Sequence, residues 1–413
     1  MKKEIIIKTV VSSLMCMAVL PVFSKKINIH DFTVTEKDFV DTIPITFKYN
    51  KIFFPVIIND HTYHFIFDTG SDIEAINESA GIDCQKLDVT AVASDASGVN
   101  KRKQIVRMPD LQIGKLHIQD MKAIVLGKSA LDCYNDGLIG FNLIRKKILV
   151  KVDISNKRMI LTDRKHFFDN EQGTVVKYED QGTPIVPFTL SHFGSDYAIF
   201  DTGRVGLLDL NKDLYDFILK KNTKKKKSNA DFLKQIVWKQ NGTTGYSVNG
   251  NAPESEINYI DAEQLFLGGI EFDHAKINTR PGFCGFGSEV LKYGSMLFNP
   301  YKKSMTFQPY GNTSKINITE KAPNIVFSFQ KEKIVIGTIN PQSDPYKQGA
   351  RQGDVVVELN DKAIDDVCTF YGMTWNILRQ PTYKMKLKLR DAQGNVKSVT
   401  VEKKEDQDNT SSK

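Results

Sequence analysis

The sequence predicts a mainly β protein made of two similar halves and a smaller third unit. Three observations support this prediction. First, residues 65–71 (FIFDTGS) return nearly unchanged as residues 198–204 (AIFDTGR). Second, matching strand and turn patterns follow each copy. Third, residues 325–402 carry a separate series of short strand patterns with one helical pattern, which is typical of a small independent unit.

In each copy of the repeated stretch, an apolar strand-like run ends in an aspartate, and a threonine and a glycine follow. Glycine takes turn conformations that are closed to other residues, so each aspartate is expected on a tight loop beside a buried strand. A single turn of this kind could simply close a hairpin. The second copy favours a catalytic pair, Asp68 and Asp201.

The similarity between the halves extends past the two aspartate loops. Each half continues with a long β segment, an apolar turn ending in glycine, a short helix and a closing hairpin. The matching segments are 110–118 with 264–272, 136–144 with 284–291, and the strand patterns 148–153 and 158–161 with 295–300 and 304–307. We interpret this as an internal duplication.

With two such loops, residues 40 to 310 resemble the pepsin and retropepsin group of aspartic proteases. The resemblance implies a bilobal pepsin/retropepsin-like acid protease fold, with lobes at 25–168 and 169–310 and a cleft between them. It also implies that Asp68 and Asp201 share a water molecule. Two carboxylates that close cannot both ionise easily, so one keeps a proton, as is established for such dyads.

The resemblance also assigns supporting roles beside the dyad, to Thr69, Gly70, Ser71, Thr202, Gly203 and Arg204. The threonines are expected to lock the two loops together. The glycines are expected to bring backbone N–H groups close to the acids. The Ser71 hydroxyl is expected to donate a hydrogen bond to the Asp68 carboxylate.

Arg204 departs from the family pattern, because it stands where the first copy has Ser71 and where a small residue is usual. A guanidinium near Asp201 would favour the ionised form of that carboxyl and leave the proton mainly on Asp68. If Arg204 instead reached into the water site, it would leave a non-catalytic peptide-binding or scaffold protein on the same fold. A third possibility is that Arg204 points to solvent.

A protease of this type needs a hairpin that folds over the substrate. Residues 93–100 (ASDASGVN) and 241–250 (NGTTGYSVNG) are the candidates, although both compositions also suit ordinary hairpin tips. The flap candidates within them are Ser97, Gly98, Gly245 and Tyr246. Pepsin-like enzymes usually carry an aromatic residue on the first flap, whereas here Tyr246 lies on the second.

After a polar linker at 311–324, residues 325–403 resemble a small α+β PDZ-like domain of the type found in exported bacterial proteases. Such domains bind extended chain ends at a sheet edge. The carboxylate-binding loop would correspond to Ile325, Val326 and Phe327, with Val326 where glycine is typical. Peptide docking and simple packing on the protease lobes are both open. The tail at 404–413 is expected to be disordered.

The N-terminus predicts export. Lys2 and Lys3 precede an apolar run over residues 9–23 that is short for a membrane span, so residues 1–24 are interpreted as a secretory signal peptide. The mature chain would begin near Lys25 and lie in the periplasm or outside the cell. A retained N-terminal anchor is the alternative, and nothing later resembles a transmembrane helix.

The remaining composition limits the function classes. Cys84, Cys133, Cys284 and Cys368 form no metal-binding pattern, and their pairing stays open. The net charge of +7 falls to about +5 without the signal segment, and its most visible source is the lysine-rich insertion at 220–227. That run is expected to be solvated or to dock an anionic surface, and it lacks the aromatic residues of a nucleic-acid binder. We therefore expect an aspartic endopeptidase with a polypeptide substrate, no cofactor and no metal.

Overall fold

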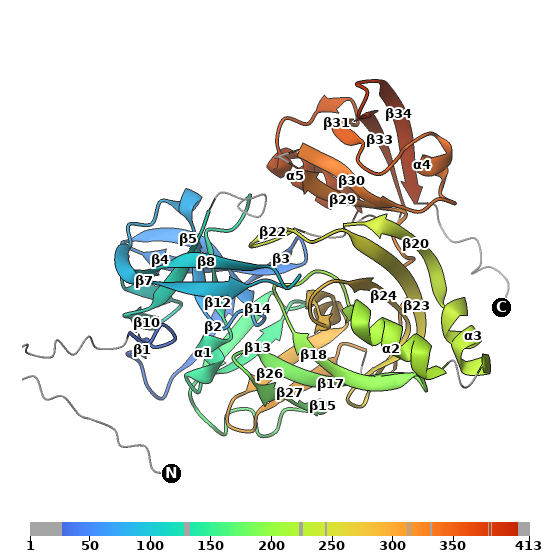
Figure 1. The fold of residues 1–413 in the computed structure, drawn as a ribbon. Coiled ribbons are helices and arrows are strands. Elements are labelled where there is room, and N and C mark those ends of the chain that lie inside the picture. Colours follow the sequence, from blue (N-terminus) through green and yellow to red (C-terminus); the bar gives the residue numbers. More distant parts are fainter. Residues whose placement is uncertain are drawn as a thin grey trace, which may run out of the picture.

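The structure of the protein is a computed structural model that describes residues 27–127, 133–222, 226–243, 246–311, 313, 315–330, 333–378, 380 and 382–403. The predicted signal peptide and the C-terminal tail lie outside these residues. The described chain is mainly β, as the sequence predicted. Figure 1 shows two β-rich halves side by side, with the third unit above them.

The sheet of the first half is organised around the strand that carries Asp68. Eleven described strands form it, in the order β1-β10-β9-β4-β5-β12-β6-β11-β8-β7, with β3 paired to β4. They are β1 (Thr33–Val34), β3 (Thr46–Lys48), β4 (Lys51–Ile58), β5 (His61–Asp68), β6 (Glu74–Asn77), β7 (Gln85–Ser94), β8 (Asn100–Arg107), β9 (Leu111–Ile113), β10 (Leu116–Gln119), β11 (Lys122–Leu126) and β12 (Gly137–Gly140). A 3₁₀ turn η1 (Glu78–Ala80) and a short helix α1 (Asn142–Arg145) complete the half.

The second half repeats this arrangement. Nine described strands form its sheet, in the order β16-β17-β18-β25-β19-β24-β23-β20, with β28 paired to β24. They are β16 (Glu179–Asp180), β17 (Pro184–Leu190), β18 (Gly194–Phe200), β19 (Leu208–Asn211), β20 (Ile236–Gly242), β23 (Ser255–Leu267), β24 (Ile270–Arg280), β25 (Gly285–Phe286) and β28 (Lys315–Asn317). The series β18-β25-β19-β24 has the same order as β5-β12-β6-β11, and its pairs are parallel or antiparallel in the same places.

The second half also carries elements that the first lacks. The described residues of the lysine-rich insertion lie at the end of helix α2 (Lys212–Asn222) and the start of helix α3 (Lys226–Lys234). The second predicted flap contains a small hairpin of β21 (Tyr246–Ser247) and β22 (Gly250–Asn251). The 3₁₀ turn η2 (Ser288–Lys292) follows the glycine turn, as α1 does in the first half.

A third sheet joins the halves. Its order is β15-β27-β26-β13-β14-β2, from strands β2 (Val40–Pro44), β13 (Leu149–Asp153), β14 (Arg158–Thr162), β15 (Thr174–Lys177), β26 (Gly294–Asn299) and β27 (Ser304–Pro309). The central pair, β13 with β26, is antiparallel and takes one strand from each half. Beneath the aspartate loops, the ring of Phe298 packs 6.2 Å from that of Phe67 and 5.9 Å from that of Phe200. One buried apolar core therefore runs through both halves.

The third unit has its own apolar core and sheet, ordered β29-β30-β31-β33-β34 with β32 paired to β31. Its elements are β29 (Ile325–Gln330), β30 (Lys333–Ile339), α4 (Asp344–Lys347), β31 (Val355–Leu359), β32 (Lys362–Ala363), α5 (Val367–Leu378), β33 (Tyr383–Arg390) and β34 (Val396–Lys403). One prediction is wrong in this unit: Ile325, Val326 and Phe327 begin the edge strand β29 and do not form a loop. β-Branched and aromatic side chains favour an extended strand.

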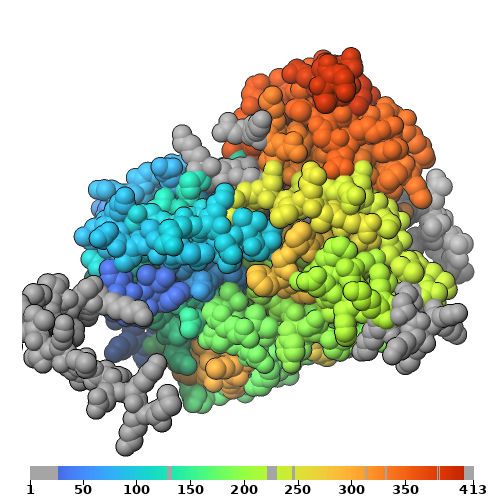
Figure 2. Space-filling model, in the orientation of Figure 1, coloured from blue at the N-terminus to red at the C-terminus, as the bar shows by residue number. Residues whose placement is uncertain are grey.

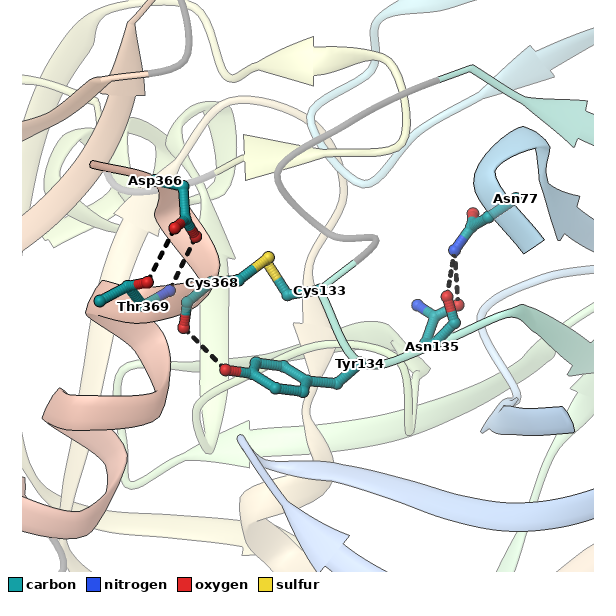
Figure 3. The surroundings of a disulfide bond; sticks show 7 residues. All are labelled: Asn77, Cys133, Tyr134, Asn135, Asp366, Cys368 and Thr369. Atoms are coloured by element: carbon teal, nitrogen blue, oxygen red, sulfur yellow. Dashed lines mark hydrogen bonds between the residues drawn. A yellow bond between two sulfur atoms is a disulfide. The ribbon is translucent and has the colours of Figure 1, made fainter. Parts of the chain in front are cut away.

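The third unit is fastened to the first half by a disulfide between Cys133 and Cys368, near the start of helix α5 (Figure 3). The hydroxyl of Tyr134 donates a 2.7 Å hydrogen bond to the carbonyl of Cys368. The ring of Tyr49 stacks on Tyr134 with centroids 4.4 Å apart and lies 5.2 Å from the ring of Trp375. Cys84 and Cys284 carry free thiols, so the one described bridge resolves the pairing that the sequence left open.

The third unit also packs on the second half. The backbone N–H of Ile339 donates to Gln240 Oε1 at 2.6 Å, and the hydroxyls of Tyr259 and Thr338 lie 2.7 Å apart. The carbonyl of Phe329, on the edge strand, accepts a hydrogen bond from the Asn251 amide. The third unit thus contacts both halves. Among the described residues, no helix is long and apolar enough to cross a membrane.

We expect Cys368→Ser to lower the free energy of unfolding by about 2–5 kcal/mol, because the disulfide restricts the unfolded chain over a long loop. Thermal and denaturant unfolding of the oxidised proteins measures this, with Cys84→Ser as the matched control at a free thiol. Equal stabilities of wild type and Cys368→Ser would contradict the bridge.

Candidate active site

Two aspartates occupy equivalent positions in the two halves. Asp68 ends β5, where Gly140 of β12 pairs with it in parallel register. Asp201 directly follows β18, and its backbone N–H donates to the carbonyl of Phe286 at 2.9 Å. Each aspartate therefore leaves a buried strand beside the glycine turn of its own half, which is the arrangement that the repeated sequence predicted.

The threonines that follow the aspartates link the two loops. The backbone N–H of Thr69 donates to Thr202 Oγ1, and that of Thr202 donates to Thr69 Oγ1, both at 3.0 Å. The Thr69 hydroxyl donates to the carbonyl of Phe200 at 2.6 Å. The Thr202 hydroxyl donates to the carbonyl of Phe67 at 2.7 Å. Both threonines are fully buried, so these four hydrogen bonds hold the loops in fixed register.

The glycines show how closely the loops meet. A Cβ atom on Gly70 would lie 2.2 Å from Cγ of Asp201, and a Cβ atom on Gly203 would lie 2.2 Å from Cγ of Asp68. The N–H of each glycine donates to the carboxylate of its own half, Gly70 to Asp68 at 3.0 Å and Gly203 to Asp201 at 2.8 Å. Each carboxyl therefore occupies space that only a glycine in the other half leaves open.

The two carboxyls share a proton. Burial first, and then the charge of Asp201 and a hydrogen bond with it, raise the pKa of Asp68 to about 8. The charge of Lys51 and the Gly70 N–H act in the opposite direction. At neutral pH Asp68 is thus the protonated member of the pair.

Ser71 does not play the role that was expected. Its hydroxyl donates to the carbonyl of Ile73 at 2.6 Å and not to the Asp68 carboxylate. Serine hydroxyls readily bond backbone groups two residues away, and the bent loop brings the Ile73 carbonyl within reach. The carbonyl of Ser71 accepts a bond from the N–H of Phe141 at 2.8 Å. Ser71 therefore shapes the loop against the glycine turn.

Arg204 is buried and lies between two carboxylates, so it does not point to solvent. Its Nε atom lies 3.5 Å from Asp201 Oδ2, and its Nη1 atom lies 3.1 Å from Asp209 Oδ2. The same Nη1 donates to the carbonyl of Phe283 at 3.1 Å. Asp209 and Phe283 thus hold the guanidinium beside Asp201.

The second half makes room for this guanidinium with two further changes. A Cβ atom on Gly285 would lie 2.5 Å from Arg204 Cζ, and Gly285 pairs with Asp209 across β25 and β19. At the equivalent pair of the first half, Leu138 faces Ala75. The first half therefore has Ser71, Ala75 and Leu138 at these three positions. The second half has Arg204, its counterion Asp209, and Gly285. These paired differences were visible in the sequence, but our sequence analysis did not use them.

Asp209 connects the dyad to the first predicted flap. Arg280 Nη1 lies 2.8 Å from Asp209 Oδ2, and Arg280 Nη2 donates to Ser97 Oγ at 3.0 Å. Ser97 is buried at the tip of the β7–β8 hairpin. A continuous polar chain thus runs from Asp201 through Arg204, Asp209 and Arg280 to the flap tip.

The two flap candidates contact each other, and Figure 2 shows the cyan β7–β8 region against yellow residues of the second half. The Ser247 hydroxyl donates to Asp95, and the Asn249 amide donates to the carbonyls of Ala93 and Val99 at 2.9 and 2.8 Å.

The first flap tip also meets the second half near Gly98, which has a φ of 77° that favours glycine. A Cβ atom on Gly282 would lie 2.3 Å from the carbonyl oxygen of Ala96. Of the other flap candidates, Gly245 lies outside the described residues. Tyr246 begins β21.

Lys51, Asp209 and Arg280 belong to this site, although our sequence analysis did not single them out. All three come from strands, Lys51 from β4, Asp209 from β19 and Arg280 from β24. In the described part of the chain, no cluster of three or more His, Cys, Asp or Glu side chains could hold a metal ion.

We predict that Thr202→Ala lowers the free energy of unfolding by about 2–4 kcal/mol, since it removes one buried hydrogen bond donated by the hydroxyl and one accepted by it. Thr202→Ser keeps the hydroxyl and should cost much less. Denaturant unfolding of the two variants beside wild type measures the difference. Equal losses for both variants would mean that the hydroxyl does not lock the loops.

Comparisons with known proteins found one similarity, which covers part of the first half. A family model described as aspartyl protease matches residues 54–143, which include Asp68 and the glycine turn of the first half. A search of curated proteins returned no match. The matched segment is thus similar to aspartyl proteases.

Proposed function

We propose that this protein is an aspartic endopeptidase that hydrolyses peptide bonds with a water molecule activated between Asp68 and Asp201. The observation that carries the proposal is the reciprocal packing of the two loops, in which each carboxyl lies against the glycine of the other. The threonine hydrogen bonds and the raised pKa of Asp68 support it. The match to the aspartyl protease family model supports the same reaction class.

In the proposed reaction, ionised Asp201 removes a proton from the water molecule, and the oxygen of that water attacks the carbonyl carbon of the peptide bond. Asp68 donates its proton to the carbonyl oxygen, which gives a neutral tetrahedral diol. The C–N bond then breaks, the nitrogen receives the proton held by Asp201, and Asp68 takes back a proton from the diol. The pair ends with one proton, as it began, and the products are an acid and an amine.

The asymmetry of the site supports this division of roles. The guanidinium of Arg204 lies beside Asp201, with its Nε atom 3.5 Å from Asp201 Oδ2. Burial favours the neutral form of Asp68. The non-catalytic alternative required an arginine that occupies the water site, whereas the guanidinium here is held by Asp209 and the carbonyl of Phe283.

For the third unit, we propose a packing role ahead of peptide docking. The edge strand β29 would have to be free for an added strand, but its Phe329 carbonyl is bonded to Asn251 and Val326 packs beside Trp238 and Tyr259. Contacts to both halves support a clamp across them. The alternative is that this unit selects long substrates. Removal of the chain from residue 323 onward tests it, because a truncated protein that is soluble and folded but differs in substrate choice would favour docking.

We also propose that the protein is exported and that its mature chain begins near Lys25. A disulfide between described residues fits an oxidising compartment. N-terminal sequencing of protein from the native host is the test, and recovery of Met1 would contradict it.

Asp68→Asn and Asp201→Asn should each abolish peptide hydrolysis, because an amide cannot exchange the proton that the pair needs. Cleavage of a diverse peptide pool between acidic and neutral pH measures activity, and thermal unfolding confirms that the variants fold. Full activity in either variant would refute the dyad. A wild-type protein that binds peptides and cleaves none would favour the non-catalytic alternative.

The pH profile should have an alkaline limb near pH 8, since activity is lost as pH rises and Asp68 gives up the proton that it must donate. Arg204→Ser should lower kcat/KM, because the charge that Asp201 carries as the base loses the guanidinium beside it. Arg280→Gln is the matched control, as it removes the other guanidinium on Asp209. An unchanged kcat/KM in Arg204→Ser would mean that Arg204 has no influence on the base.

A further inference from the structure

Lys51 lies beside the dyad, although neither the repeat nor the family match assigns it a role. It is the first residue of β4, which pairs with β5 in antiparallel register, Phe53 opposite Ile66 and Phe54 opposite Phe65. When this register is continued by two residues, Lys51 stands opposite Asp68. Directly opposed residues of antiparallel strands project to the same face, with Cβ atoms about 4.5–5.5 Å apart.

The second half has a neutral residue at the equivalent position. Strands β17 and β18 pair with Ile185 opposite Ile199, and the continued register brings Thr183 opposite Asp201. The two aspartates therefore receive their cations from different places. Asp201 has Arg204 on its own loop, whereas Asp68 has Lys51 on the neighbouring strand.

The backbone around Lys51 is held from both halves. Lys51 closes the β3–β4 hairpin opposite Lys48, across a turn in which Tyr49 and Asn50 both have a φ of 54°. The carbonyl of Asn50 accepts a 2.6 Å hydrogen bond from the hydroxyl of Ser288, which lies in the second half. This fixes the start of the side chain relative to the dyad.

Charged groups of both halves act on the half-buried Lys51 side chain. Burial lowers the pKa of Lys51, and the carboxyls of Asp68 and Asp201 raise it. The guanidiniums of Arg204 and Arg280 lower it. In return, the ammonium of Lys51 lowers the pKa of Asp68 and so opposes the effect of burial.

We propose that Lys51 is a positioning residue of the dyad, which faces Asp68 from the neighbouring strand β4 and sets the upper pH limit of peptide hydrolysis. The proposal rests on the proposed protease function. Burial alone would keep the proton on Asp68 to higher pH, and Lys51 moves the working range back toward neutral pH. It acts on Asp68 and has no covalent part in the reaction.

The test compares wild type with Lys51→Met and Lys51→Arg, using Lys48→Met as the matched control. Lys48 belongs to the same hairpin, but its ammonium lies over the rings of Tyr49 and Tyr134, at 4.7 and 5.0 Å from their centroids. Lys51→Met should move the alkaline limb of kcat/KM upward by about one pH unit. Lys51→Arg should restore the wild-type limb, and Lys48→Met should leave it in place.

A second readout does not depend on activity. In protein labelled with ¹³C at aspartate carboxyls, the resonance of Asp68, assigned with Asp68→Asn, should titrate at higher pH in Lys51→Met than in wild type. If no peptide is cleaved, the protease proposal fails but this titration still decides the role of Lys51. An unchanged Asp68 titration in folded Lys51→Met, or in Lys51→Gln if the first variant does not fold, would overturn the inference.

Discussion

The structure depends on the contact between the two aspartate loops. The carboxyl of each loop fills the space that a side chain on the glycine of the other loop would need. The carboxyl of Asp68 lies against Gly203 and that of Asp201 against Gly70, while Thr69 and Thr202 exchange hydrogen bonds beneath them. Because these bonds are buried, any relative shift of the halves would break several of them together. The shared central sheet pairs one strand from each half, and the third unit contacts both halves.

On this nearly symmetric frame the charges are arranged asymmetrically. The second half carries an arginine, an aspartate and a glycine where the first has a serine, an alanine and a leucine. This set places a cation beside Asp201, and Lys51 approaches Asp68 from another strand. Two carboxyls that both stand between Ile-Phe and Thr-Gly thus lie in different electrostatic surroundings, which is what a general acid and a general base need. The same set continues through Arg280 to the flap tip, so flap position and dyad charge share one polar network.

The sequence allowed the β-rich duplication and the pairing of Asp68 with Asp201 to be predicted, because strand periodicity and the repeated loop are local signals. The predictions from sequence were wrong where several hydrogen-bond or pairing partners lie within reach and only the three-dimensional structure decides between them. The Ser71 hydroxyl found a backbone carbonyl nearer than the carboxylate, and the residues at 325–327 extended an edge strand. Lys51 could have been found by counting back from Asp68 across the turn at Asn59 and Asp60, but only once the register was trusted. Arg280 had no comparable signal, since its partners Asp209 and Ser97 come from distant strands and a hairpin tip.

The central claim is that Asp68 and Asp201 form one site around a single reacting group. It is tested most directly by the crystal structure of the protein with a peptide in which a secondary alcohol replaces the scissile carbonyl, since such a group resembles the tetrahedral intermediate. The account predicts the alcohol oxygen within hydrogen-bonding distance of both carboxyls, and binding that weakens at least tenfold in Asp68→Asn. An alcohol bound away from one of the aspartates, or affinity unchanged by the substitution, would contradict it.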